Sequence, residues 1–251
     1  MEKQNGLSKN RNICELLAPA GSKEAFIAAV ESGADAVYAG GNLFNARINA
    51  HNFELAEIEE AVHFAHKRNV KVYITINVLI KDEELLEALE YAKNLYEIGV
   101  DAIIVQDIGF ANLVRKHLPG FELHMSTQAS VFDKDGVYQA MDLGFRRVVP
   151  ARELSLAEIE TLCKETPCEI EVFCHGAICV CYSGQCQMSR YIGGRSGNRG
   201  GCAQPCRLPY KSADRSGGTK ETALLSPSDM SMIDHLDKLC EAGVRDRKSV
   251  V

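Results

Sequence analysis

The chain has 251 residues, of which 46% are hydrophobic and 25% are charged, and its formal net charge at pH 7 is −6. This composition is that of a globular protein with enough apolar residues for one barrel-sized domain or two small ones. The negative charge argues against a nucleic-acid binder that is basic all over, although it leaves room for a local basic surface. No apolar run approaches the roughly 20 residues of a membrane span, and the polar start has no signal-peptide core, so we expect a cytoplasmic protein with no membrane partner.

Along the chain, amphipathic helical segments alternate with short apolar segments, commonly with a glycine between them. We expect strands near 13–18, 35–40, 70–77, 101–106, 121–127, 145–150 and 169–174. We expect helices near 22–33, 54–68, 82–98, 108–117, 133–143 and 155–165. Ser22, Asp82 and Ser155 stand at helix starts, and Glu158 follows Ser155 at the spacing of a capping box.

The strand segments are apolar on nearly every residue, which predicts a parallel sheet covered on both faces. Strict alternation of strands and helices, without a long nucleotide loop, favours a closing (β/α)8 TIM-like barrel. A doubly wound open sheet is the alternative, although the chain contains no GxGxxG motif.

The alternation stops after the seventh strand. Residues 176–216 are rich in Gly, Cys and Arg and show no helical or strand period, and such a long irregular insert is usually functional or disordered. The pattern resumes over 224–244, where we expect a helix followed by a glycine turn.

An eighth strand is due after Val244, but the polar run Asp246–Val251 follows instead. This run matches what a common sequencing adapter encodes in one reading frame. We therefore expect a barrel domain over 13–245 that lacks its last strand, a Cys/Gly/Arg-rich insert over 174–215 and a non-native tail over 246–251. A genuine, frayed C-terminus is the alternative.

Six of the ten cysteines lie between Cys174 and Cys206, and in a chain without an export signal this crowding indicates metal ligation or redox chemistry. Only Cys202 and Cys206 have the short spacing of a zinc knuckle. Wide, uneven spacing with several glycines favours an iron–sulfur cluster, with zinc as the second choice and unliganded or redox thiols as the third. We interpret the remaining cysteines as core or surface thiols: Cys14, Cys163, Cys168 and Cys240.

The insert leaves the C-terminal end of the seventh strand, which is the face where barrel active sites are built. Polar residues end several other predicted strands on this face and together suggest the lining of a pocket. They are Asn77, Gln106, Asp107, Ser126, Thr127, Gln128, Arg152 and His175. We consider His175 as a ligand or acid–base group, with a hydrogen-bonded loop histidine as the alternative.

Between Gln187 and Ala213 the chain has five cations and no carboxylate, which predicts a local surface that attracts anions. Arginine geometry suits phosphate or carboxylate, so we expect RNA or a small anionic or aromatic substrate as the partner. A solvated loop that happens to be basic is the alternative. The five cations are Arg190, Arg195, Arg199, Arg207 and Lys211.

The segment EVFCHGAICVCYSGQCQMS at 171–189 closely resembles the signature of the U32 peptidase family, the collagenase-like proteases. The resemblance continues over most of the chain, in the expected order. It includes ELLAPAGS, YAGGNLFNARINAHNF, HMSTQASV, RSGNRGGCAQPCR and LLSPSDM.

The resemblance implies a 4Fe–4S cluster, since better-understood relatives hold one on four cysteines. Matched by motif, Cys179, Cys186 and Cys202 are the implied ligands, and the fourth is Cys206, Cys240 or a residue further downstream. We expect His175, Gln128 and Asn77 to serve in catalysis. We expect Arg195, Asn198, Arg199 and Arg47 to bind the substrate.

The resemblance also implies oxygen-independent hydroxylation of tRNA, ribosomal RNA or a quinone precursor, with prephenate serving some RNA-modifying relatives. The residues themselves show no Ser/His/Asp set by spacing and no HExxH, and Cys174–His175 offers adjacency but no evidence of geometry. We therefore expect an Fe–S-dependent hydroxylase acting on RNA or a small aromatic precursor. A collagenase-like peptidase and a non-catalytic binding protein with a structural cluster are the alternatives.

Overall fold

The computed structural model describes residues 14–47, 52–213 and 218–249. Eight strands pair in parallel, each with the next, and β11 pairs with both β7 and β1, so the sheet closes on itself. The prediction of a (β/α)8 TIM-like barrel is confirmed, and the open-sheet alternative is wrong. The barrel strands are β1 (Glu15–Ala20), β2 (Ala36–Gly40), β3 (Lys71–Ile76), β4 (Ala102–Val105), β5 (Glu122–Met125), β6 (Arg147–Val148), β7 (Glu169–Gly176) and β11 (Asp246–Ser249).

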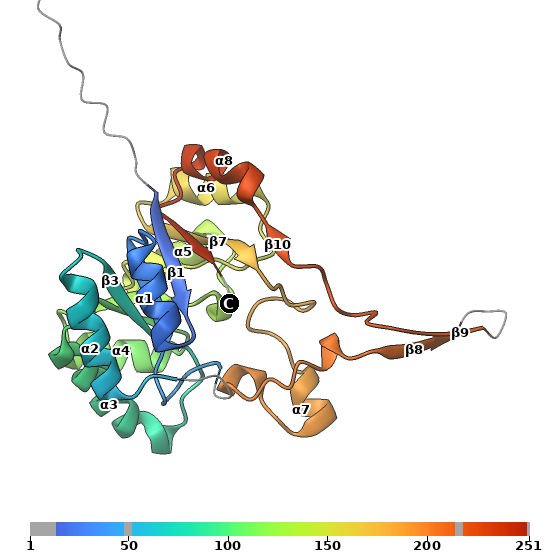
Figure 1. Cartoon of the computed structure of the whole chain (residues 1–251), viewed down its shortest axis with the longest axis horizontal. Helices are drawn as coiled ribbons and strands as arrows, with labels where there is room; N and C mark the ends of the chain where they lie inside the picture. Colours follow the sequence, from blue (N-terminus) through green and yellow to red (C-terminus); the bar gives the residue numbers. More distant parts are fainter. Residues whose placement is uncertain (1–13, 48–51, 214–217, 250–251) are drawn as a thin grey trace, which may run out of the picture.

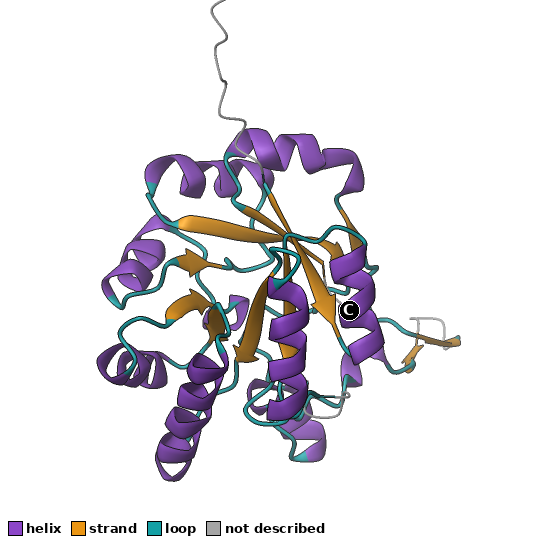
Figure 2. Cartoon of the chain, turned by 60° about the vertical axis from the view of Figure 1, so that its left-hand side comes forward, coloured by secondary structure: helices purple, strands orange, loops and turns teal. Residues whose placement is uncertain are grey.

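Helices lie between successive barrel strands and surround the sheet (Figure 2). Two helix starts that the sequence predicts are confirmed. The Ser22 hydroxyl accepts a hydrogen bond from the Ala25 N–H, and Ser155 forms a capping box with Glu158. The helices are α1 (Lys23–Glu31), α2 (Leu55–His66), α3 (Leu85–Ile98), α4 (Ile108–His117), α5 (Lys134–Asp142), α6 (Leu156–Glu165) and α8 (Leu236–Ala242).

Strand β3 shows why the barrel strands are apolar on nearly every residue. Ile74 and Ile76 belong to the large core between sheet and helices, whereas Tyr73 packs inside the barrel with Leu17 and Ile104. Alternate residues of a strand point to opposite faces, so both faces of this strand are buried.

The end of the barrel where the strands begin is filled by charges instead. Arg147 is 1% exposed, and its guanidinium pairs with Asp246 at 2.7 Å, Glu15 at 3.1 Å and two glutamates of β7. A buried charge is tolerated only where it is paired and hydrogen-bonded, and this network meets that condition.

The expectation of a missing eighth strand and an unpaired tail is wrong for residues 246–249. These residues form β11, which occupies the eighth place between β7 and β1. The polar sequence is accommodated because Asp246 pairs with Arg147, and the Lys248 ammonium lies 2.9 Å from Glu171 inside the barrel. The non-native origin of these residues stays a prediction, and residues 250–251 lie outside the described residues.

The segment between β7 and β11 contains more regular structure than its composition indicates. Short helix α7 (Met188–Gly193) is followed by the antiparallel hairpin of β8 (Tyr210–Ala213) and β9 (Thr219–Thr222), which projects away from the barrel (Figure 1). Strand β10 (Met230–Ser231) then pairs antiparallel with β7. The helix expected over 224–244 is limited to α8. The single-turn 3-10 helices are η1 (Asp82–Glu84), η2 (Thr127–Ala129), η3 (Gly197–Arg199), η4 (Pro205–Arg207) and η5 (Ile233–His235).

No helix in the described part of the chain is long and apolar enough to cross a membrane.

Candidate active site at the cysteine loop

Residues 177–207, here called the cysteine loop, are attached to the ends of three barrel strands. The first attachment is to the segment after β5. The Ser130 hydroxyl donates to the Ser183 carbonyl at 2.6 Å and accepts from the Gln185 side-chain amide at 2.8 Å. Gly184 has a φ of 73°, and a Cβ there would lie 1.9 Å from the Gln128 carbonyl oxygen, so only glycine allows this close approach.

The second attachment is to Arg152 and Glu153, which follow β6. The Ser183 hydroxyl accepts from the Arg152 N–H at 3.2 Å, and the Ser183 N–H donates to the Glu153 carboxylate. The Arg152 guanidinium donates to the Ala177 carbonyl at 3.4 Å and to the Cys179 sulfur at 3.7 Å. Arg152 and Glu153 are therefore both bound to the loop. The contacts involve the loop backbone, a serine hydroxyl and a thiol.

The third attachment is an ion pair to η1, after β3. Both Nη atoms of Arg199 donate to the Glu84 carboxylate, at 2.6 and 2.8 Å, and one of them also donates to the Leu79 carbonyl. The Leu79 N–H in turn donates to the Asn198 carbonyl at 3.0 Å. Hydrogen bonds from Arg199, followed by one from the Lys81 backbone, lower the pKa of Glu84 to about 2.

Replacing Arg199 by alanine should loosen this attachment without unfolding the barrel. Glu84 contributes stability above its unfolded pKa of about 4.5 that is lost as the pH falls toward about 2, because its folded pKa is depressed. Hydrogen exchange should therefore show faster exchange of the Leu79 amide in Arg199→Ala at neutral pH. In the unsubstituted chain the loss should begin only below about pH 4.5 and approach that of the variant near pH 2. Equal exchange in both proteins would contradict the attachment, and the exposed Arg195→Ala is the control.

The cysteine loop carries five thiols, among them the half-buried Cys181, whose pKa is raised by burial and by its neighbour Cys186. Cys179 and Cys202 are exposed, whereas Cys186 and Cys206 are half-buried. Burial raises the pKa of Cys206, Arg207 lowers it, and the thiols of Cys179, Cys202 and Cys186 raise it further. In the described ranges no three His, Cys, Asp or Glu side chains stand close enough to hold one metal ion. The thiols thus form a loose group.

The other cysteines have different surroundings. Burial raises the pKa of Cys163 and of Cys168 to about 11, so both stay protonated near neutral pH. Cys240 packs against the core from α8, which lies on the opposite side of the molecule from α7 (Figure 1). The interpretation of Cys14, Cys163, Cys168 and Cys240 as core or surface thiols agrees with these positions.

The three predicted catalytic residues are not gathered around one point by the described contacts. His175 is exposed near the end of β7, opposite Ser231 of β10. The Asn77 side chain accepts from the Ala46 N–H at 2.9 Å and so fixes the segment after β2. Gln128 contributes its carbonyl, which accepts from the Gln106 side chain and lies against Gly184.

The predicted substrate-binding residues divide into two kinds. Arg195 and Arg47 are exposed, as an anion-binding role requires. Arg199 and the Asn198 backbone instead serve the attachment of the loop. Arg207 is likewise engaged, because it donates to the Ile178 and Pro227 carbonyls. The basic surface is therefore smaller than the count of cations indicates.

Sequence reasoning missed a group of cations and aromatic rings beside the loop. The Lys248 ammonium lies 4.0 Å from the ring centroid of Tyr38, and the Arg152 guanidinium carbon lies 5.4 Å from that of Phe173. Burial raises the pKa of Tyr38, while Lys248, Arg47 and Arg152 act against this rise. Arg152 itself is among the polar residues that the sequence predicts at the strand ends, a short way after β6, but the rings and the Lys248 ammonium around it carry no local signal.

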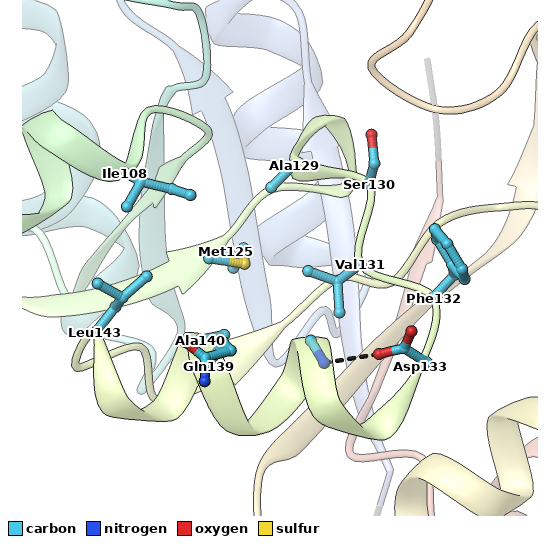
Figure 3. Close-up of a pocket in the computed structure, with 11 residues that line it drawn as sticks. Ile108, Met125, Ala129, Ser130, Val131, Phe132, Asp133, Gln139, Ala140 and Leu143 are labelled. Carbon is cyan, nitrogen blue, oxygen red and sulfur yellow. Dashed lines mark hydrogen bonds between the residues drawn. The ribbon is translucent and has the colours of Figure 1, made fainter.

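A separate cavity of about 240 Å³ lies outside the barrel. Its apolar lining comes from the start of α4, from β5 and the segment after it, and from α5, and includes Ile108, Met125 and Val131 (Figure 3). Ser130 also lines it, so the cavity adjoins the first attachment of the cysteine loop but contains none of the loop thiols.

A closed parallel barrel with a cysteine-containing loop fixed at the C-terminal ends of its strands has the architecture of TIM-barrel enzymes. The sequence profile of Peptidase family U32 matches residues 21–248, and the chain belongs to this family.

Two curated relatives are named for RNA modification. The 23S rRNA 5-hydroxycytidine synthase of Escherichia coli (strain K12) is 45% identical over 238 residues, which is 93% of this chain and 36% of that protein. A tRNA hydroxylation protein of Bacillus subtilis (strain 168) is 39% identical over 243 residues, which is 93% of this chain and 57% of that protein. The chain thus spans between about a third and three fifths of the length of these relatives.

Among solved structures, a U32 peptidase superposes with a TM-score of 0.61 and 12% sequence identity. The match covers 95% of this chain and 93% of that one. At this identity the likeness shows the shared fold.

Proposed function

We propose that this chain forms the barrel of an RNA hydroxylase that works without molecular oxygen and holds a 4Fe–4S cluster. The observation that carries the proposal is that Cys179, Cys186, Cys202 and Cys206 all lie, exposed or half-buried, on a loop fixed by hydrogen bonds to the C-terminal ends of the strands. The names of the relatives support RNA as the substrate, and a small aromatic precursor is the second choice.

The residues present fit such a cluster. Thiolates are the soft ligands that iron–sulfur clusters take, and each of the four sulfurs is exposed or half-buried, in contrast to the buried Cys14 and Cys168. Cys206 is the fourth ligand in this proposal, since Cys240 packs against the core at α8. When bound, the cluster would supply electron transfer.

The side chains around the loop suit a nucleotide. Base stacking on aromatic rings and phosphate binding by arginine are the ordinary means of holding single-stranded RNA. Phe173 presents a ring beside Arg152 and Tyr38 one beside Lys248, and the exposed Arg195 and Arg47 present charges for phosphate or for an anionic co-substrate such as prephenate. We expect the target base to enter at this end of the barrel.

The described geometry gives little support to a cysteine peptidase. Cys174 and His175 are neighbours on β7, at the point where its register with β11 shifts. The Cys174 thiol donates to the Lys248 carbonyl at 3.4 Å and packs against the core, while His175 is exposed. A nucleophile must be available to its base, whereas this thiol is directed to a backbone carbonyl and packed against the core.

Protein purified without air should be brown and contain about four irons per chain. Incubated with prephenate and RNA from cells that lack the homologous enzyme, it should form a hydroxylated nucleoside detectable by mass spectrometry. Gelatin should stay intact in the same preparation. A colourless protein with stoichiometric zinc, or cleavage of gelatin without RNA modification, would refute the proposal.

A further inference from the structure

Arg152 is the one arginine whose described contacts join a loop thiol to the barrel wall. Its guanidinium donates to the Cys179 sulfur and to the Ala177 carbonyl, at 3.7 and 3.4 Å. Its Nε is buried and has no hydrogen-bond partner in the part of the chain that the structure describes. A buried polar atom without a hydrogen bond costs free energy. The other contacts of the Arg152 side chain must therefore hold it in this position.

The guanidinium also lies beside the barrel interior. Its central carbon is 5.4 Å from the ring centroid of Phe173, a residue of β7 whose ring also lies 5.6 Å from the Lys248 ammonium. A planar guanidinium can stack on a ring and donate in its own plane to two acceptors at once, which a lysine ammonium cannot do. Arg152 thus contacts the loop and the barrel wall with one rigid group.

We propose that Arg152 is a positioning residue that orients the cluster through Cys179 and raises the reduction potential of the cluster. The inference rests on the proposed function, because it requires the cluster. A hydrogen bond to a thiol at 3.7 Å is weak, but it strengthens when the sulfur carries the negative charge of a metal-bound thiolate. Reduction adds a further negative charge, so a nearby cation and a hydrogen bond to a ligand sulfur stabilise the reduced form.

The Arg152 side chain contributes to the attachment of the loop backbone through its hydrogen bond to the Ala177 carbonyl, whereas other contacts of the loop do not depend on this side chain. The Arg152 backbone N–H, not its side chain, binds Ser183, and Glu153 and Ser130 bind the same residue independently. A substitution of the Arg152 side chain therefore leaves all three of these hydrogen bonds in place. Arg190 provides the matched control, since it is an exposed arginine of the same loop whose side chain donates to the Gly194 carbonyl.

The test measures the midpoint potential of the cluster in the purified holoprotein by anaerobic redox titration. Absorbance and electron paramagnetic resonance monitor the titration. Arg152→Met should lower the midpoint potential by at least about 59 mV, which corresponds to a tenfold change in the equilibrium constant of a one-electron reduction. Arg152→Lys, which keeps the charge, should recover part of this shift. Arg190→Met should leave the potential unchanged.

An unchanged potential in Arg152→Met with full iron content would overturn the inference while leaving the proposed function standing. Natural protein that holds no cluster would refute the proposed function itself. If Arg152→Met does not retain iron, Arg152→Gln, which keeps donors but loses the charge, decides the matter. A lowered potential in that variant supports the inference, and an unchanged one overturns it.

Discussion

Replacing Arg147 by methionine should destabilise the barrel by about 3–5 kcal/mol, the usual cost of removing one partner from a buried ion network. Its guanidinium pairs with carboxylates from three other strands, of which Glu171 is fully buried and Glu15 nearly so. Without Arg147 these carboxylates would stay close together in a low-dielectric interior, with Lys248 as the remaining buried cation. A loss of this size is a large part of the stability of an ordinary domain.

Arg146 is the control, because it is the neighbouring residue and pairs with the same Glu169. Its side chain is 65% exposed, whereas that of Arg147 is 1% exposed. Exposed pairs contribute about 0–1 kcal/mol, so Arg146→Met should unfold at nearly the same urea concentration as the natural chain. Equal midpoints for Arg146→Met and Arg147→Met would show that the network does not stabilise the barrel.

The barrel itself could be predicted because its signal is local. Continuous apolar strands and single amphipathic helices specify a parallel sheet covered on both faces, and helix starts at Ser22 and Ser155 are marked by capping residues. The interior charges could not be predicted in the same way. Arg147 and Asp246 are distant in sequence, and each alone is typical of a solvent-exposed position, so the sequence predicts a tail where the structure has the eighth strand.

The site could be predicted only in part, for a similar reason. Crowding of the cysteines within one segment marked the loop, since spacing is visible in the sequence. The attachments were not visible, because they join residues such as Ser130 with Ser183 and Glu84 with Arg199, which come together only in the closed barrel. Hence the sequence predicts Arg199 at the substrate, whereas in the structure its guanidinium is paired with Glu84.

Replacing any one of the four proposed ligands by serine should remove most of the bound iron and abolish RNA hydroxylation. The expected variants are Cys179→Ser, Cys186→Ser, Cys202→Ser and Cys206→Ser. A serine hydroxyl is a harder and far less acidic donor than a thiol, so it replaces a thiolate poorly at an iron–sulfur cluster. Iron content, visible absorbance and nucleoside mass spectrometry measure the loss.

Cys181→Ser is the matched control, because Cys181 lies on the same loop between two proposed ligands and is half-buried like Cys186. Together with Cys240→Ser it should keep full iron, since Cys240 lies in α8 against the core. A comparison of Cys206→Ser with Cys240→Ser also identifies the fourth ligand. Full iron in Cys206→Ser combined with loss in Cys240→Ser would show that the loop rearranges toward α8, and that the grouping of thiols around Cys206 is not the site of the cluster.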